Sequence, residues 1–158
     1  MKKGMVSVLS TLAGAAIGAG TVGTMREKEV QKWRGYSNKH LVLYKMMCQW
    51  VRLKQEGKNL VDYFEKMGYK KIAIYGMSYA GDTLISELEG TKVQVAYGID
   101  RNAENIYAGI EVVSMDEPLD EVDAIVVTAV TFFDEIAKAL SDKMDCPIIS
   151  LEDILYEM

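Results

Sequence analysis

The sequence KIAIYGMSYAG, residues 71–81, is the most informative part of this chain. Its first half is a short apolar run of the kind that forms a buried strand. Its second half holds Gly76 and Gly81, with Ser78 between them. A strand that passes directly into spaced glycines is typical of the turn that receives phosphate groups in nucleotide-binding α/β domains. We therefore expect a phosphate-bearing ligand at this turn.

Each position of the turn has its own physical role. In the dinucleotide fingerprint the first glycine allows the tight turn, the second lets the backbone approach the pyrophosphate, and the third lets the helix pack on the strand. Gly76 and Gly81 take the first and third places, and Ser78 takes the second. The Ser78 hydroxyl and the backbone amides that begin at Met77 could hold a phosphate at the helix N-terminus. The turn therefore predicts the fold more strongly than it predicts a dinucleotide.

Short apolar runs alternate with segments of helical periodicity from residue 72 to the end of the chain. Strands are expected at residues 72–75, 93–99, 111–114, 124–128 and 147–151. Helices are expected at residues 79–89 and 132–140, with a helical turn at the end. Continuous apolar strands separated by helices predict an α/β fold, with a Rossmann-like parallel sheet of about five strands covered by helices on both faces.

Three further candidates for ligand binding stand where strands end. Asp100 ends the second strand, where a carboxylate can accept hydrogen bonds from both ribose hydroxyls, although it can equally cap the segment that follows. Arg101 could meet a phosphate. Thr128 closes the fourth strand at the carboxyl edge, where open α/β sheets bind their ligands.

These residues carry a family resemblance. Residues 72–81, the sequence YGID at 97–100 and VDAIVVT at 122–128 resemble a compact NAD(P)-binding Rossmann domain. They are especially similar to the sugar-nucleotide-binding domains that precede bacterial sialic-acid and bacillosamine-type acetyltransferases, and to accessory domains of cell-surface polysaccharide synthesis. The resemblance covers residues 70–158 and implies that Gly76, Ser78, Gly81 and Asp100 bind the ligand. The β-helix repeats that transfer acetyl groups in those enzymes are absent from this sequence, so their activity is not implied.

The N-terminal stretch of residues 4–23 has no charged residue and about the length that crosses a bilayer. A membrane anchor, a cleaved signal peptide and a soluble helix are the three interpretations, of which we favour the anchor. More Lys and Arg follow the stretch than precede it, which places the rest of the chain in the cytoplasm. The expected localisation is thus the cell membrane, with a single pass.

Residues 26–69 are expected to be helical and to lie between the anchor of residues 1–25 and the nucleotide-binding domain of residues 70–158. After a cap at Ser37 or Asn38, apolar residues recur at three- and four-residue steps, at Leu41, Tyr44, Met47 or Cys48, and Val51, and Gly57 ends this first helix. A second short helix follows Asn59. Residues 37–67 could pack on the sheet or bind a second copy or another protein.

The composition excludes several classes of function. A net charge of −5 without a basic stripe argues against nucleic-acid binding. Cys48, Cys146 and His40 are too few and too scattered for a metal site, so no metal is expected.

No catalytic residue can be assigned from the sequence. No tyrosine has a lysine four positions later, and no P-loop or nucleophile elbow is present. We expect an accessory or sensing module that binds a nucleotide, a nucleotide-sugar or NAD(P). The alternatives are an NAD(P)-dependent sugar oxidoreductase or epimerase, and an interaction platform that binds no ligand.

Overall fold

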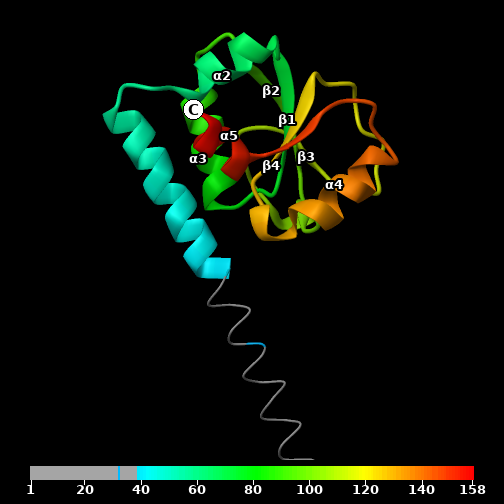
Figure 1. Ribbon diagram of the computed structural model, residues 1–158. Helices are drawn as coiled ribbons and strands as arrows, with labels where there is room; N and C mark the ends of the chain where they lie inside the picture. The colour runs from blue at the N-terminus through cyan, green and yellow to red at the C-terminus, as the bar shows by residue number, and fades with distance from the viewer. Residues whose placement is uncertain (1–31, 33–38) are drawn as a thin grey trace, which may run out of the picture. The chain divides into compact units, whose positions relative to one another are not determined.

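A five-stranded, all-parallel sheet forms the centre of the computed structural model, which describes residue 32 and residues 39–158 (Figure 1). The strands are β1 (Lys71–Tyr75), β2 (Gln94–Ile99), β3 (Val112–Val113), β4 (Ala124–Val127) and β5 (Ile148–Ser150). Their order in the sheet is β3-β2-β1-β4-β5. This is the order of the first five strands of the doubly wound nucleotide-binding fold. The predicted α/β class and parallel sheet are confirmed.

Helices connect and flank the strands. They are a helix over residues 39–55, α2 (Leu60–Met67), α3 (Tyr79–Leu88), α4 (Phe133–Ser141) and α5 (Leu151–Glu157), with 3-10 turns η1 (Ala103–Asn105) and η2 (Val130–Phe132). Gly68 ends α2 in the left-handed conformation (φ 79°) and donates its N–H to the carbonyl of Glu65, as a glycine stop should. The terminal helical turn expected from the sequence is the longer helix α5.

The two faces of the sheet are covered unequally. Ile72 and Ile74 of β1 point to one face, which packs against α2, α3, α5 and the helix that ends at residue 55. Ala73 and Tyr75 point to the other face, which packs against α4 and the loops around it. Helices thus cover both faces, as predicted. The connection from β2 to β3 contains the turn η1 in place of an α-helix, which leaves α4 as the α-helix of the second face.

The helix of residues 39–55 buries a face that its apolar spacing did not indicate. Met46, Trp50 and Leu53 lie in the core, whereas Tyr44 and Val51, which follow the predicted three- and four-residue steps, are exposed. Apolar residues occupy several sides of this helix, so spacing alone does not select the side that packs.

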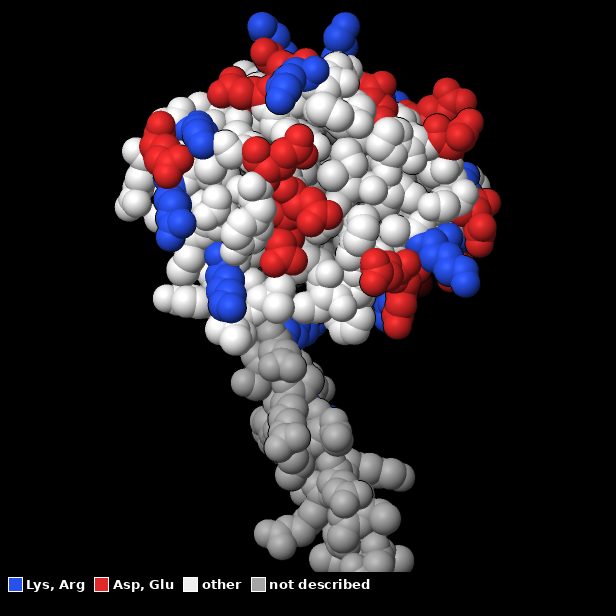
Figure 2. Space-filling view, viewed as in Figure 1, with Lys and Arg blue, Asp and Glu red and all other residues white. Residues whose placement is uncertain are grey.

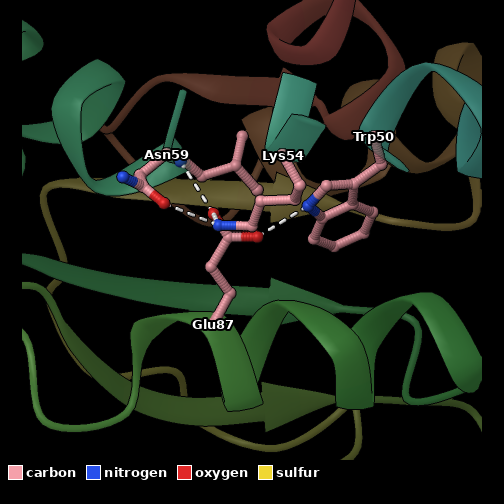
Figure 3. A network of polar contacts seen from close by, with 5 residues as sticks. Trp50, Lys54, Asn59 and Glu87 are labelled. Atoms are coloured by element: carbon pink, nitrogen blue, oxygen red, sulfur yellow. Dashed lines mark hydrogen bonds and ion pairs between the residues drawn. The ribbon is translucent and has the colours of Figure 1, made fainter. Parts of the chain in front are cut away.

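Glu87 of α3 joins this helix to the rest of the domain (Figure 3). One carboxylate oxygen, Oε2, accepts a hydrogen bond from Trp50 Nε1 at 2.6 Å. The other, Oε1, accepts from Lys54 Nζ at 2.6 Å and from the backbone N–H of Leu60 at 2.9 Å. The carboxylate is only 7% exposed, so these donors replace the water that it loses on burial.

The predicted anchor at residues 4–23 lies outside the described residues, as do the domain boundary at residue 25 and the start of the helical segment. Within residues 39–158, no helix combines the length and the apolar content that crossing a bilayer requires.

Candidate functional site

Gly76 begins the candidate site, immediately after β1. Its φ of +99° lies in the region that side chains disfavour. A Cβ at this position would lie 2.7 Å from Thr128 Oγ1 and 3.2 Å from the backbone nitrogen of Ala129. The Gly76 N–H donates to the carbonyl of Ile99 at 2.9 Å, which ties the turn to the end of β2. Both the backbone conformation and the crowding therefore require glycine.

Gly81 sets how closely α3 approaches the turn. A Cβ on Gly81 would lie 2.5 Å from the carbonyl oxygen of Gly76. Any side chain would push the first turn of α3 away from β1. Gly76 and Gly81 thus have the geometry of the first and third glycines of the fingerprint.

The N-terminus of α3 presents backbone donors at the carboxyl edge of the sheet. Ser78 is the N-cap residue, is exposed, and makes no side-chain cap bond. Its carbonyl accepts the N–H of Asp82, but the N–H groups of residues 78–81 donate to no acceptor in the described part of the chain. Unpaired donors and the positive end of the helix dipole together attract an anion.

The Met77 amide, which we expected to face a ligand, donates instead to Asp100. Its N–H lies 2.9 Å from Asp100 Oδ2, and the N–H of Asn102 lies 2.9 Å from Oδ1 of the same carboxylate. Asp100 therefore both caps the segment after β2, one of the two roles expected for it, and holds the glycine turn. Each carboxylate oxygen accepts one bond and retains a lone pair for a further donor such as a ribose hydroxyl.

The side chain of Met77 packs against Gly98 of β2, a contact that the sequence analysis missed. A Cβ on Gly98 of β2 would lie 2.6 Å from Met77 Sδ, so the methionine fills the space that this glycine leaves open. A glycine inside a strand is the signal that could have revealed this contact, because it often marks a close approach of another group.

Thr128, which follows β4, stabilises the turn. It is only 1% exposed, and its hydroxyl donates to the carbonyl of Gly76 at 2.6 Å. Its role is thus to position Gly76. Arg101 is exposed, and no hydrogen bond or ion pair holds its guanidinium among the described residues. The structure brings six of the predicted residues together around one turn, whereas the side chain of Arg101 is not held there. The six are Gly76, Met77, Ser78, Gly81, Asp100 and Thr128.

A hollow of about 480 Å³ opens at the carboxyl ends of β4 and β5. It begins two residues after Thr128 and is lined by Val130, Thr131, Phe132, Phe133, Asp134, Glu135, Ser150, Glu152 and Asp153. Four carboxylates make it unfavourable for phosphate groups and suitable for groups that donate hydrogen bonds, such as sugar hydroxyls.

Groups that could perform catalysis are sparse around the turn. His40 is exposed on the first helix, in a different part of the sequence from the turn. No three Asp, Glu, His or Cys side chains of the described residues are grouped as a metal site. The arrangement can hold an anion and can accept hydrogen bonds from hydroxyl groups.

Comparison with known proteins gives one family. The family model described as C2185-like, N-terminal, matches residues 68–148, a range that begins before β1 and ends at β5. It therefore contains the whole glycine turn and Asp100. No curated protein and no solved structure matches the chain.

Proposed function

The chain belongs to the C2185-like family, whose N-terminal domain spans its glycine turn, and we propose that this domain binds a nucleotide or a nucleotide-sugar through residues 76–81. The observation that carries the proposal is the N-terminus of α3, where the N–H groups of residues 78–81 find no acceptor within the described part of the chain. Gly76 and Gly81 keep side chains away from this point. A diphosphate would replace the missing acceptors and would lie at the positive end of the helix.

The position of the turn in the sheet supports the same proposal. β1 lies between β2 and β4, and the chain leaves β1 for β2 on one side and returns to β4 on the other. Ligands of open α/β sheets bind in the crevice that forms where the strand order reverses. Asp100 at the end of β2 and the hollow beyond β4 lie on the two sides of this point.

A nucleotide-sugar fits the charges better than a dinucleotide does. The acidic hollow next to the turn would repel a second set of phosphates, whereas its carboxylates can accept hydrogen bonds from sugar hydroxyls. Ser78 also stands where the dinucleotide fingerprint has its middle glycine. The resemblance to sugar-nucleotide-binding domains of cell-surface polysaccharide synthesis supports this choice.

We favour an accessory or sensing role over catalysis, because the turn and the hollow offer binding groups without an acid–base pair. The anchor at residues 4–23 would hold the module at the cytoplasmic face of the cell membrane. Membrane fractionation of the chain with and without residues 1–25 tests the anchor; recovery of the full chain in the soluble fraction would rule it out.

An interaction platform without a ligand is the second candidate, and one observation favours it. Asp100 already accepts two backbone N–H groups, so the site is stable without a ligand. The oxidoreductase alternative has no comparable support.

Calorimetric titration of the full chain in detergent tests the binding proposal. Uridine diphosphate sugars, NAD and NADP are titrated into the chain and into two variants. Gly76→Ala introduces a methyl group into the turn, whereas Gly90→Ala does so at a positive φ in open space. We expect binding heat from the sugar nucleotides that Gly90→Ala retains and Gly76→Ala loses. Absence of heat with every nucleotide would favour the interaction platform.

A further inference from the structure

The helix that ends at residue 55 has an apolar side that the core does not use. Tyr44 is 67% exposed and Val51 is 54% exposed, and Cys48 between them is exposed as well. Steps of four and three residues place these side chains on one side of the helix. The core side, with Met46, Trp50 and Leu53, lies away from them. We call Tyr44, Cys48 and Val51 the outer stripe.

Cationic side chains flank the outer stripe. Lys45 and Arg52 are exposed and each follows a residue of the stripe, which places them along one of its edges. Lys54 lies near the other edge, where it pairs with Glu87. Residues 42–55 contain no Asp or Glu. The helix therefore combines an apolar strip with positive charge alone.

The rest of the domain has the opposite charge. In residues 56–158, Asp and Glu far outnumber Lys and Arg. Figure 2 shows mainly basic side chains along the left of this view, over the helix of residues 39–55, acidic ones through the middle, and both kinds at the top and right. An anionic surface would therefore attract this helix and repel the remainder of the domain, which fixes one orientation.

We propose that residues 42–55 dock on the surface of a bilayer that contains anionic lipids. The outer stripe enters the boundary between headgroups and acyl chains, and Lys45 and Arg52 contact lipid headgroups. A basic amphipathic helix with an amphipathic aromatic residue is suited to this position. A second copy fits less well, because two such helices would bring their cationic edges together.

The proposed docking does not depend on nucleotide binding. The proposed anchor would contribute only by keeping the helix close to a membrane. Residues 24–41 separate the anchor from the docking helix, so an inserted anchor would deliver the helix to the same bilayer surface. The helix would then hold the carboxyl edge of the sheet in a fixed orientation relative to the membrane.

Cys48 allows the docking to be measured directly, because it lies within the outer stripe. The full chain is mixed with nanodiscs of phosphatidylcholine alone or of phosphatidylcholine with phosphatidylserine. Alkylation by a charged maleimide is followed by peptide mass spectrometry. We expect anionic nanodiscs to slow the alkylation of Cys48 several-fold relative to neutral ones. Salt at about 1 M, where the Debye length is about 3 Å, should remove much of this protection. Cys146, which packs near α4 on the other face of the sheet, serves as the internal reference.

Two double variants complete the test. Lys45→Glu with Arg52→Glu should abolish the protection of Cys48. Lys66→Glu with Lys138→Glu changes the net charge equally on exposed residues of α2 and α4 and should preserve it. Retention of the chain on nanodiscs at high salt reports the anchor separately. Equal Cys48 alkylation on neutral and anionic nanodiscs would overturn the proposal. So would protection without lipid, which would assign the stripe to a second copy or another protein.

Discussion

The backbone N–H of Met77 donates a 2.9 Å hydrogen bond to the Asp100 carboxylate, so the glycine turn after β1 is closed by the residue that follows β2. A nucleotide bound as proposed would contact the domain at Asp100 and at the backbone N–H groups that follow Met77. The same carboxylate that could receive a ribose thus also sets the shape of the proposed phosphate-binding turn. Stability and ligand affinity are therefore expected to change together at Asp100.

Replacing Asp100 tests this dual role. Asp100→Ala removes the acceptor of two backbone N–H groups and should lower the free energy of unfolding by about 1–3 kcal/mol. Asp100→Asn keeps one acceptor oxygen and should cost less. Urea unfolding gives the stabilities, and calorimetry gives the affinity for a sugar nucleotide. Equal stability of Asp100→Ala and the unmodified chain would contradict the structural role.

The two glycine variants separate conformational strain from crowding. Gly76 and Gly90 both have positive φ values, of 99° and 72°, but only Gly76 has atoms near its Cβ position. We expect Gly90→Ala to lose about 1 kcal/mol and Gly76→Ala about 2–4 kcal/mol, because strain and overpacking add at Gly76. Urea unfolding measures both losses. Similar losses would mean that Thr128 moves aside at little cost.

Glu87 is expected to be the most sensitive polar residue outside the turn. Glu87→Ala leaves Trp50 Nε1 and the N–H of Leu60 without their acceptor in a region that is largely buried. The free energy of unfolding should fall by about 2–4 kcal/mol. Glu89→Gln, at an exposed position just after α3, is the control and should stay within about 0.5 kcal/mol. Thermal or urea unfolding measures the two losses, and equal losses in Glu87→Ala and Glu89→Gln would contradict this role of Glu87.

Two buried tyrosines of the second face should respond differently to loss of the hydroxyl. Tyr97 donates to the carbonyl of Asp120 at 2.6 Å, whereas the buried hydroxyl of Tyr75 has no partner among the described residues. Tyr97→Phe should cost about 1 kcal/mol, and Tyr75→Phe should be neutral or stabilising. Burial also raises the pKa of Tyr97 to about 12, so Tyr97→Phe should remove one late-ionising group from the ultraviolet titration, whereas Tyr63, whose pKa burial also raises, should remain. A loss of stability in Tyr75→Phe would show that its hydroxyl has a partner.

Asp123 gives a prediction for acid pH. Backbone N–H groups of Lys71 and Lys70 bond to its carboxylate and hold its pKa below the usual 3.8. A lowered pKa means that the contribution to stability is complete above the unfolded pKa and is lost as the pH falls through the folded one. Asp123→Asn should therefore lose stability at neutral pH and approach the unmodified chain as acid protonates the Asp123 carboxylate. A difference that is independent of pH would contradict this assignment. The side chain is exposed, so the effect is expected to be small.

The sheet and its helices could be predicted from the sequence because periodicity and glycine spacing are local signals. The strand run before Gly76 and the stop at Gly68 depend on neighbouring residues alone. The observed β2, β3, β4 and β5 lie within the strands expected at residues 93–99, 111–114, 124–128 and 147–151, and β1 begins one residue before the expected 72–75. Pairing with neighbouring strands sets these limits. The six residues around the turn come together because parallel strands bring their carboxyl ends to one edge.

Long-range polar contacts could not be predicted in this way. Nothing near Glu87 in the sequence indicates that Trp50 and Leu60 donate to it, since the partners come from separate helices. Asp123 stands in an acidic stretch that resembles a solvated loop, yet it bonds to the start of β1. The sequence likewise did not show which side of the helix of residues 39–55 is exposed, because that helix carries apolar residues on several sides.

The proposed binding of nucleotide phosphates at the N-terminus of α3 should be visible, residue by residue, in backbone amide chemical shifts. Backbone amide spectra of the full chain in detergent micelles are recorded while a uridine diphosphate sugar is added. We predict the largest shifts at the N–H groups of residues 78–81, with smaller ones near Asp100, and loss of these shifts in Gly76→Ala. Amides of residues 78–81 that stay in place at saturating nucleotide, or shifts confined to another surface, would contradict the claim.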